Sequence, residues 1–234
     1  MKSRTLISFV LAVDVSALIV LAVLPASALG EQLSTLLLLV GLATLAGARP
    51  VHIPTLRHEI TASHPFIFLA LATVGPLAAA LVAMAGVVGA AVGRKGRLPL
   101  TIHLVFNLGT VVLSTTAAAG AFALAGGRPG QAVHSLIFPL VAATATYFIA
   151  NSGLVAAVIA LEKRQGLFST WRTSFVWTAT PFATGLTLAI AMLAVLETSM
   201  LWVLVLSLAP CWLMLMGYRA HANTLRLENT NRSP

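Results

Sequence analysis

The sequence predicts an all-α protein, a polytopic membrane helix bundle of about seven or eight segments. Hydrophobic residues make up 59% of the 234-residue chain and charged residues only 9%, and the mean hydropathy is +0.96. Such a chain has too little polar surface to stay soluble. Its 14 Lys and Arg residues fall in short clusters between apolar runs. This distribution is typical of membrane loops, and we expect no nucleic acid partner.

Eight apolar runs are candidates for membrane segments, each judged against the roughly 20 helical residues needed for a crossing. They lie near 6–24, 33–48, 62–75, 76–93, 102–125, 136–161, 178–196 and 200–217. The first imitates a secretory signal cleaved after Ala28, but its apolar run is long and contains Asp14, so we expect an uncleaved helix. Residues 1–217 then form one transmembrane bundle and residues 218–234 a polar cytoplasmic tail.

Gly75-Pro76 interrupts the apolar run from His64 to Gly93. Glycine is suited to ending one helix and proline to starting the next. The segment before the break is short for a complete crossing. Residues 62–93 are therefore predicted to form either a tight hairpin of two short helices or a re-entrant pair. Both arrangements return the chain to the side that it left.

The cations predict an orientation through the positive-inside rule. With the N-terminus in the cytoplasm, 13 of the 14 Lys and Arg residues fall inside and only Arg128 falls outside. We therefore expect both termini to be cytoplasmic, together with the loops at 94–97 and 163–172. Trp171, Trp177 and Trp202 lie near span ends and are interpreted as interface anchors.

The segment 51–65 carries three of the six histidines, His52, His58 and His64. Its "HEITASH" resembles the zinc motif HExxH only superficially, because the second histidine comes at i+6 and one helical face cannot present both rings to a metal. The prolines at 50, 54 and 65 favour an extended loop. We expect no metal site and no cofactor, with the imidazoles solvated or facing lipid headgroups.

Small residues form a seam along the helix expected at 76–93. They recur at steps of 4 and 3 and comprise Ala79, Ala83, Gly86, Ala90 and Gly93. Such a flat side lets a neighbouring backbone approach closely. We expect it to pack within the chain, and the alternative is a homodimer through the face of Gly89 and Gly93.

Polar side chains recur at helical spacing within two predicted spans. One set is His103, Asn107, Thr110 and Ser114, and the other is Thr144, Tyr147 and Asn151. Counted from the cytoplasmic helix ends at ~1.5 Å per residue, Thr110, Asn151 and Asp14 come to a depth of roughly 12 to 15 Å. Amides and hydroxyls commonly satisfy each other between membrane helices.

Asp14 is harder to explain as packing, because a carboxylate at the centre of a membrane helix costs at least ~2.5 kcal/mol and usually marks a cavity, a partner or a proton. The predicted ligand-binding residues are Asp14, His103, Asn107, Thr110, Ser114, Tyr147 and Asn151.

Catalytic motifs are scarce. Only six acidic residues occur, and five of them lie at predicted membrane edges or beyond. The chain has no Walker-type phosphate loop, no GxSxG elbow and no acidic pair suited to Mg²⁺. Its single cysteine, Cys211, leaves no disulfide, CxxC pair or Cys-based zinc site. We therefore do not expect an enzyme.

Four stretches carry a family resemblance: "HPFIFLALATVGPLAAALVAMAGVVGA", "LVFNLGTVVLS", "ATYFIANSGLVAAVIAL" followed by Gly166 and Trp171, and "SFVWTATPFATGLTLAIAML". From about residue 33 to 220 the chain resembles the membrane-associated sensor (MASE-type) domain that precedes HD-GYP or GGDEF output domains in bacteria. The resemblance implies a sensor in the bacterial cytoplasmic membrane. Only sixteen residues follow Tyr218, without an HD or GGDEF motif, so the expectation is signalling through a separate cytoplasmic enzyme or membrane partner.

The Gly-Pro hairpin and its small-residue helix also resemble the vitamin-binding S-components of energy-coupling-factor transporters. This resemblance implies an alternative function, a small-molecule binding or transport subunit. A second alternative is a structural membrane partner of a complex. A sensor should bind its ligand with little flux, whereas a transport subunit should accumulate substrate once an ATPase module is supplied.

Overall fold

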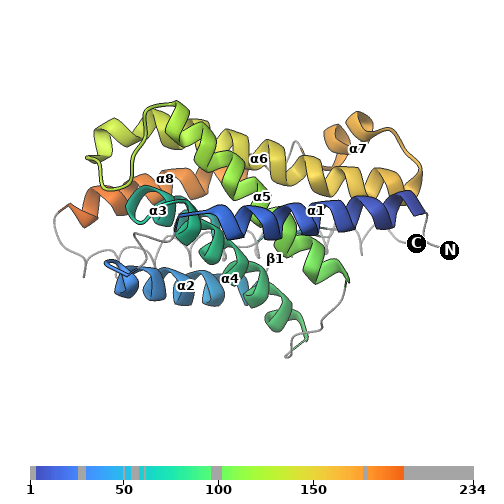
Figure 1. Ribbon diagram of the computed structural model, residues 1–234, viewed down its shortest axis with the longest axis horizontal. Helices are drawn as coiled ribbons and strands as arrows, with labels where there is room; N and C mark the ends of the chain where they lie inside the picture. The colour runs from blue at the N-terminus through green and yellow to red at the C-terminus, as the bar shows by residue number, and fades with distance from the viewer. Residues whose placement is uncertain are drawn as a thin grey trace, which may run out of the picture.

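The computed structural model describes residues 4–25, 30–49, 51–53, 58–60, 62–95, 102–175 and 179–197. These residues form eight α-helices and two short strands, which confirms the predicted all-α bundle (Figure 1). In chain order they are α1 (Arg4–Val23), α2 (Leu33–Gly47), β1 (Val51–Ile53), β2 (His58–Ile60), α3 (His64–Thr73), α4 (Pro76–Lys95), α5 (Ile102–Leu124), α6 (Val133–Lys163), α7 (Leu167–Ser174) and α8 (Ala179–Leu196).

Five of the described helices are long and apolar enough to cross a membrane, namely α1, α4, α5, α6 and α8. The helices α2 and α3 are apolar but shorter. The chain is therefore a multi-pass membrane protein. The eighth predicted segment, 200–217, lies outside the described residues, as do the C-terminal tail, Trp177 and Trp202.

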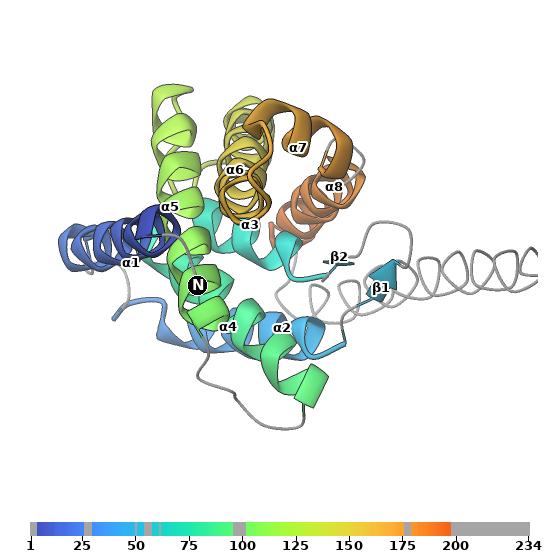
Figure 2. The ribbon, with the colours of Figure 1, turned by 90° about the vertical axis from the view of Figure 1, so that its right-hand side faces the viewer.

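Helix α3 lies in the middle of the bundle, where it packs against α2, α4, α6 and α8 (Figure 2). Eight of its ten residues are buried, the run Pro65–Ala72. Pro65 lies in its first turn, where a missing N–H does no harm. At ~1.5 Å per residue α3 spans about 15 Å, half of a ~30 Å hydrocarbon core. This confirms that the segment before Gly75-Pro76 is too short to cross.

The turn between α3 and α4 depends on glycine. Gly75 has φ +126°, a backbone conformation that side chains rarely adopt. Its N–H donates to the carbonyl oxygen of Ala70 at 2.9 Å, and Pro76 then begins α4. The predicted helix break is therefore confirmed. The expectation that both helices of the pair are short is wrong for α4, which has 20 residues and is long enough to cross a membrane.

The small-residue seam of α4 packs against α2 within the same chain. A Cβ atom at Gly89 would collide with the carbonyl oxygen of Thr44, and one at Gly93 with that of Ala48. A Cβ atom at Gly47 would likewise collide with the carbonyl oxygen of Gly86. The backbones of α2 and α4 are thus in direct contact, as expected for small residues at a membrane helix interface. The face that offered the homodimer alternative is covered by α2.

Two ends of the bundle can be distinguished. The start of α1, the end of α6 and helix α7 lie together at one end (Figure 1), which we call the basic end because it carries Arg4, Lys163, Arg164 and Arg172. At the opposite end, the N–H of Gly130 donates to the carbonyl oxygen of Ala72 and the N–H of Val133 to Oε1 of Glu197, both at 2.9 Å. These bonds tie the α5–α6 loop to the end of α3, and the start of α6 to the residue that follows α8.

Two local expectations were incomplete. The loop expected at 51–65 contains a short antiparallel hairpin in which Val51 pairs with Ile60 and Ile53 with His58. The loop expected at 163–172 contains helix α7, whose Thr170 is buried while Phe168 is 71% exposed. An eight-residue amphipathic helix is too short to produce a hydropathy signal, so the apolar runs could not reveal it.

Candidate functional site

The inward face of α1 contains a carboxylic acid. The buried residues of this helix recur at steps of 4, 3 and 4 and are Leu6, Val10, Val13 and Ala17. Asp14 stands four residues after Val10 and directly after Val13, so it belongs to the same face. This face packs against α5 and α6. Asp14 therefore occupies a position in a stripe that is otherwise apolar.

Gly109 of α5 makes room for the Asp14 side chain. A Cβ atom at Gly109 would lie 2.6 Å from Oδ1 of Asp14 and 3.4 Å from its Cα. Oδ1 is buried and has no hydrogen-bond partner among the described residues. In hydrocarbon an unsatisfied polar group costs several kcal/mol. The α1–α5 interface therefore holds a carboxyl oxygen whose hydrogen-bonding capacity is unused.

The residues of the polar face predicted on α5 differ in burial and in hydrogen bonding. Thr110 follows Gly109 and is 1% exposed, and its Oγ1 also has no hydrogen-bond partner in the described part of the chain. Asn107 is half-buried. Ser114 is buried, but its hydroxyl already donates to the carbonyl oxygen of Thr110 at 2.7 Å.

His103 is exposed at the start of α5. The predicted face therefore divides into an exposed imidazole near one end, a satisfied hydroxyl at Ser114, and a middle part with the unpaired hydroxyl of Thr110 and the half-buried amide of Asn107. Thr110 is next to Gly109 in the sequence, whereas Asn107 lies about 160° around the helix from Gly109.

Asn151 of α6 lies at a similar level. Helices α1 and α6 run antiparallel (Figure 1), and one hydrophobic cluster joins Val10 to Val155 and their neighbours. Asp14 lies one helical turn after Val10, and Asn151 lies one helical turn before Val155. Asn151 is half-buried. We call Asp14, Asn107, Thr110 and Asn151 the Asp14 layer.

Tyr147 lies in a different environment from the other predicted ligand-binding residues. Its ring is 2% exposed and its centroid lies 5.8 Å from those of Phe68 and Phe182 and 6.1 Å from that of His64. These neighbours come from α3 and α8, not from α1. The structure therefore separates Tyr147 from the Asp14 layer.

His64 is not the solvated or headgroup-facing residue that the sequence suggested. It is half-buried, and its ring centroid lies 4.3 Å from that of Phe182. A Cβ atom at Gly185 would lie 2.8 Å from Cβ of His64, so α8 approaches α3 closely at this point. The expectation failed because His64 is the first residue of α3, which is enclosed by the bundle, so its ring meets α6 and α8 and not solvent alone.

The aromatic rings packed around Tyr147 and Phe182 continue toward helix α7 at the basic end. Phe148 lies 5.2 Å from Phe182 and 6.2 Å from Trp171, centroid to centroid. The Trp171 indole N–H donates to the Ser152 hydroxyl at 2.8 Å. Trp171, expected as an interface anchor, thus holds α7 against α6; its position at the membrane interface stays a prediction. The spacing of aromatic residues in the sequence gave no indication that four helices meet here.

Among the described residues, no three His, Cys, Asp or Glu side chains come together in a way that could hold a metal ion. The side chains of His52 and His58 lie outside the described part, so the absence of a metal site at those residues stays a prediction. Among the predicted ligand-binding residues, Asp14 and Thr110 have buried side-chain oxygens without a hydrogen-bond partner in the described part of the chain, and Asn107 and Asn151 are half-buried amides.

The chain matches no protein-family model, no curated protein and no solved structure. The resemblances to MASE-type sensor domains and to S-components therefore stay predictions. The multi-pass membrane bundle rests on the helices themselves.

Proposed function

We propose that the chain is a membrane-embedded sensing module, and that its ligand or proton acts at the Asp14 layer. The observation that carries the proposal is the buried Oδ1 of Asp14, which lies against Gly109 without a hydrogen-bond partner in the described part of the bundle. Ionisable residues inside a membrane are expensive and are usually functional. A bound proton or a hydrogen-bond donor from a ligand would satisfy this oxygen.

The neighbouring side chains suit a small polar ligand. Thr110, next to Gly109 in the sequence, has an unused hydroxyl oxygen, and the amides of Asn107 and Asn151 each carry both donors and an acceptor. A ligand between α1, α5 and α6 could therefore exchange several hydrogen bonds with the layer. This capacity supports binding and does not require catalytic chemistry.

The attachment of α1 suits a helix whose position responds to a ligand. Its buried contacts form a small cluster with α5 and α6, separate from the main core that encloses α3. A ligand that binds between α1 and α5 would favour one position of α1 over another. The start of α1 lies beside the end of α6 at the basic end, where a cytoplasmic signalling enzyme or a membrane partner would receive the signal.

A transport subunit is the alternative, and one observation favours it. Helix α3 is short, broken by Gly75-Pro76 and enclosed by the bundle. Interrupted helices near the middle of a membrane often form substrate sites in transporters. Reconstituted vesicles distinguish the two functions. A sensor retains its ligand with little flux, whereas a transport subunit accumulates substrate when an ATPase module is added.

The proposed orientation places the basic end in the cytoplasm of a bacterial cell, because cations concentrate on the cytoplasmic side of membrane proteins. In a Cys211→Ser background, Gln165→Cys at the basic end should react with an impermeant maleimide only after the membrane is permeabilised. Gln131→Cys at the opposite end should react in intact cells. The reverse pattern would invert the orientation.

The central experiment compares wild type, Asp14→Asn and Asp14→Leu in one nanodisc composition, with Ser16→Leu on the exposed face of α1 as the control. Native mass spectrometry reports small molecules that copurify, and thermal unfolding reports stability across pH. We expect Asp14→Asn to fold but to lose the copurified molecule or the pH dependence of Tm. Asp14→Leu should lose the same property as Asp14→Asn. Ser16→Leu should keep both the copurified molecule and the pH dependence of Tm. If Asp14→Leu matches wild type in binding, stability and pH dependence, Asp14 has no such role.

A further inference from the structure

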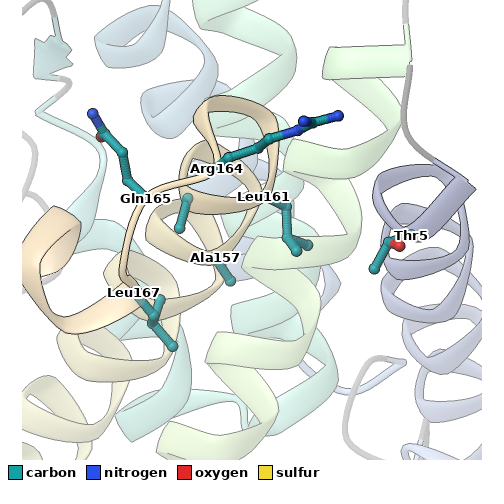
Figure 3. Close-up of a pocket in the computed structure, with 7 residues that line it drawn as sticks. Thr5, Ala157, Leu161, Arg164, Gln165 and Leu167 are labelled. Atoms are coloured by element: carbon teal, nitrogen blue, oxygen red, sulfur yellow. The ribbon is translucent and has the colours of Figure 1, made fainter. Parts of the chain in front are cut away.

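A cleft lies at the basic end, between the start of α1 and the end of α6 (Figure 3). It is partly open and has a volume of about 450 Å³, within the ~300–1,000 Å³ typical of small-molecule sites. Its walls are largely apolar and include Ala157, Leu161 and Leu167, while Thr5 contributes a hydroxyl from α1. The cleft is distinct from the Asp14 layer.

Arg164 gives the cleft a positive charge. Figure 3 shows its side chain extending from the end of α6 toward the side of α1, while Gln165 points the other way. Arg164 has φ 55° and is the only residue other than glycine with a positive φ in the described part of the chain. Glycine is the usual residue at such a helix end. Backbone strain of this kind is a reason to look for a function of the side chain.

Several features favour an anion beside Arg164. Among the described residues Arg164 makes no ion pair, and the first turns of α1 and α7 contain no acidic residue. Thr5 is the second residue of α1 and Leu167 the first of α7, so two helix N-termini flank the cleft. The N–H groups and dipole at a helix N-terminus favour negative charge.

The surroundings favour a lipid over a soluble anion. Ala157 lies about 36 Å along α6 from its first residue, which is at or beyond the ~30 Å hydrocarbon core. Next to the cleft, Leu167 is 52% and Phe168 71% exposed on α7. Apolar side chains exposed at this depth lie among lipid headgroups and upper acyl chains. A phosphate and an acyl chain of one molecule could then contact Arg164 and the apolar wall together.

We propose that this cleft binds an anionic phospholipid, with its phosphate on the Arg164 guanidinium and Thr5 hydroxyl and the start of an acyl chain against Leu161. Arginine is well suited to phosphate because its planar fork forms paired, charge-assisted hydrogen bonds. Because the site bridges α1 and α6, the bound lipid would hold the start of α1 in place. The proposal goes beyond ligand binding at Asp14 and does not depend on it.

The test is a native mass spectrometry titration of the purified full chain with phosphatidylglycerol and with phosphatidylcholine of the same acyl chains. Arg164→Gly removes the charge and supplies the residue that this backbone conformation prefers, so its Tm should equal or exceed that of wild type. Its affinity for phosphatidylglycerol should fall about tenfold. Ala157→Leu, which fills the cleft without changing charge, should weaken the same binding.

Arg172→Gln is the matched control, because Arg172 is an exposed cation at the same end that does not line the cleft. It should stay within about twofold of wild type. Three results would overturn the proposal. The first is that Arg164→Gly and Ala157→Leu both bind phosphatidylglycerol as tightly as wild type does. The second is that Arg172→Gln loses as much affinity as Arg164→Gly. Soluble glycerophosphate could also displace the lipid at equal concentration, which would assign the cleft to a water-soluble anion.

Discussion

Helices α1 and α3 are both strongly apolar, yet they are surrounded by different partners. Eight of the ten residues of α3 are buried within the protein, whereas only four of the twenty residues of α1 are buried. The outward residues of α1 include Leu11, Leu18 and Ile19, which are 57%, 67% and 61% exposed. In a membrane protein such residues face lipid. Apolar composition thus signals insertion without saying whether lipid or protein surrounds the helix.

The neighbours of the two helices explain the difference. A Cβ atom at Gly86 would lie 2.8 Å from Oγ of Ser63, just before α3, and Gly185 is equally close to His64. Glycines on α4 and α8 therefore let two helices approach the start of α3. Helix α1 has one such contact, at Gly109. Without an aqueous hydrophobic effect between them, membrane helices associate mainly through close packing.

The largest expected effect comes from truncating a buried leucine of α3. Leu71 is 1% exposed and Leu18 of α1 is 67% exposed. Leu71→Ala should lower the free energy of unfolding by about 2 kcal/mol or more, because the cavity cannot be filled by lipid. Leu18→Ala should change it by less than about 0.5 kcal/mol, because lipid replaces the lost contacts. Unfolding in mixed micelles by added SDS measures both, and equal losses would remove the distinction between the helices.

The next effect concerns the direct contact between α2 and α4. Gly89→Ala should cost about 1–3 kcal/mol, because the new methyl group meets the backbone carbonyl of Thr44. Gly41→Ala on α2 is the control, because a Cβ atom there would meet nothing within 4 Å. It should be neutral or slightly stabilising. If Gly89→Ala is neutral as well, the two backbones are not in contact.

A smaller cost is expected at the interface of α1. Gly109→Ala should lower stability by about 1 kcal/mol, less than Gly89→Ala, because a side-chain oxygen and a peripheral helix can shift more easily than a buried backbone. It should also displace Asp14 and reduce any binding there. Gly120→Ala lies on the same helix with nothing within 4 Å and should do neither. Unfolding and native mass spectrometry measure the two effects, and normal stability with normal binding would show that Asp14 does not depend on Gly109.

The smallest effect is expected where α7 is fastened to α6. Ser152→Ala removes the acceptor of the Trp171 indole N–H and should cost about 0.6 kcal/mol, the average for side-chain hydrogen bonds between membrane helices. Thr173→Ala is the control, because its exposed hydroxyl bonds the carbonyl oxygen of Ser169 in its own helix. Limited proteolysis should cut α7 faster in Ser152→Ala only. Identical cleavage of both variants would argue against this attachment.

The candidate site was predictable in part. The cost of a carboxylate in hydrocarbon singled out Asp14, and helical spacing placed Asn107 and Thr110 on one face. Neither argument could identify Gly109 as the residue opposite Asp14, because the pairing of α1 with α5 is a contact between distant parts of the chain. For the same reason Tyr147 was grouped with residues from which the structure separates it. Helical spacing shows which face of a helix a residue lies on, but it does not show which other helix packs against that face.

The sequence by itself determined that this is a multi-pass membrane bundle, where its apolar helices lie and where Gly75-Pro76 breaks one of them. Hydropathy, helix length and the backbone preferences of glycine and proline are local properties, so they can be read without a partner. Only the tertiary structure decided that α3 is enclosed, that His64 joins Tyr147 and Phe182, and that a cleft forms between Thr5 and Arg164. The physical reason is that lipid and protein interiors are equally apolar, so packing between distant segments alone selects which faces meet.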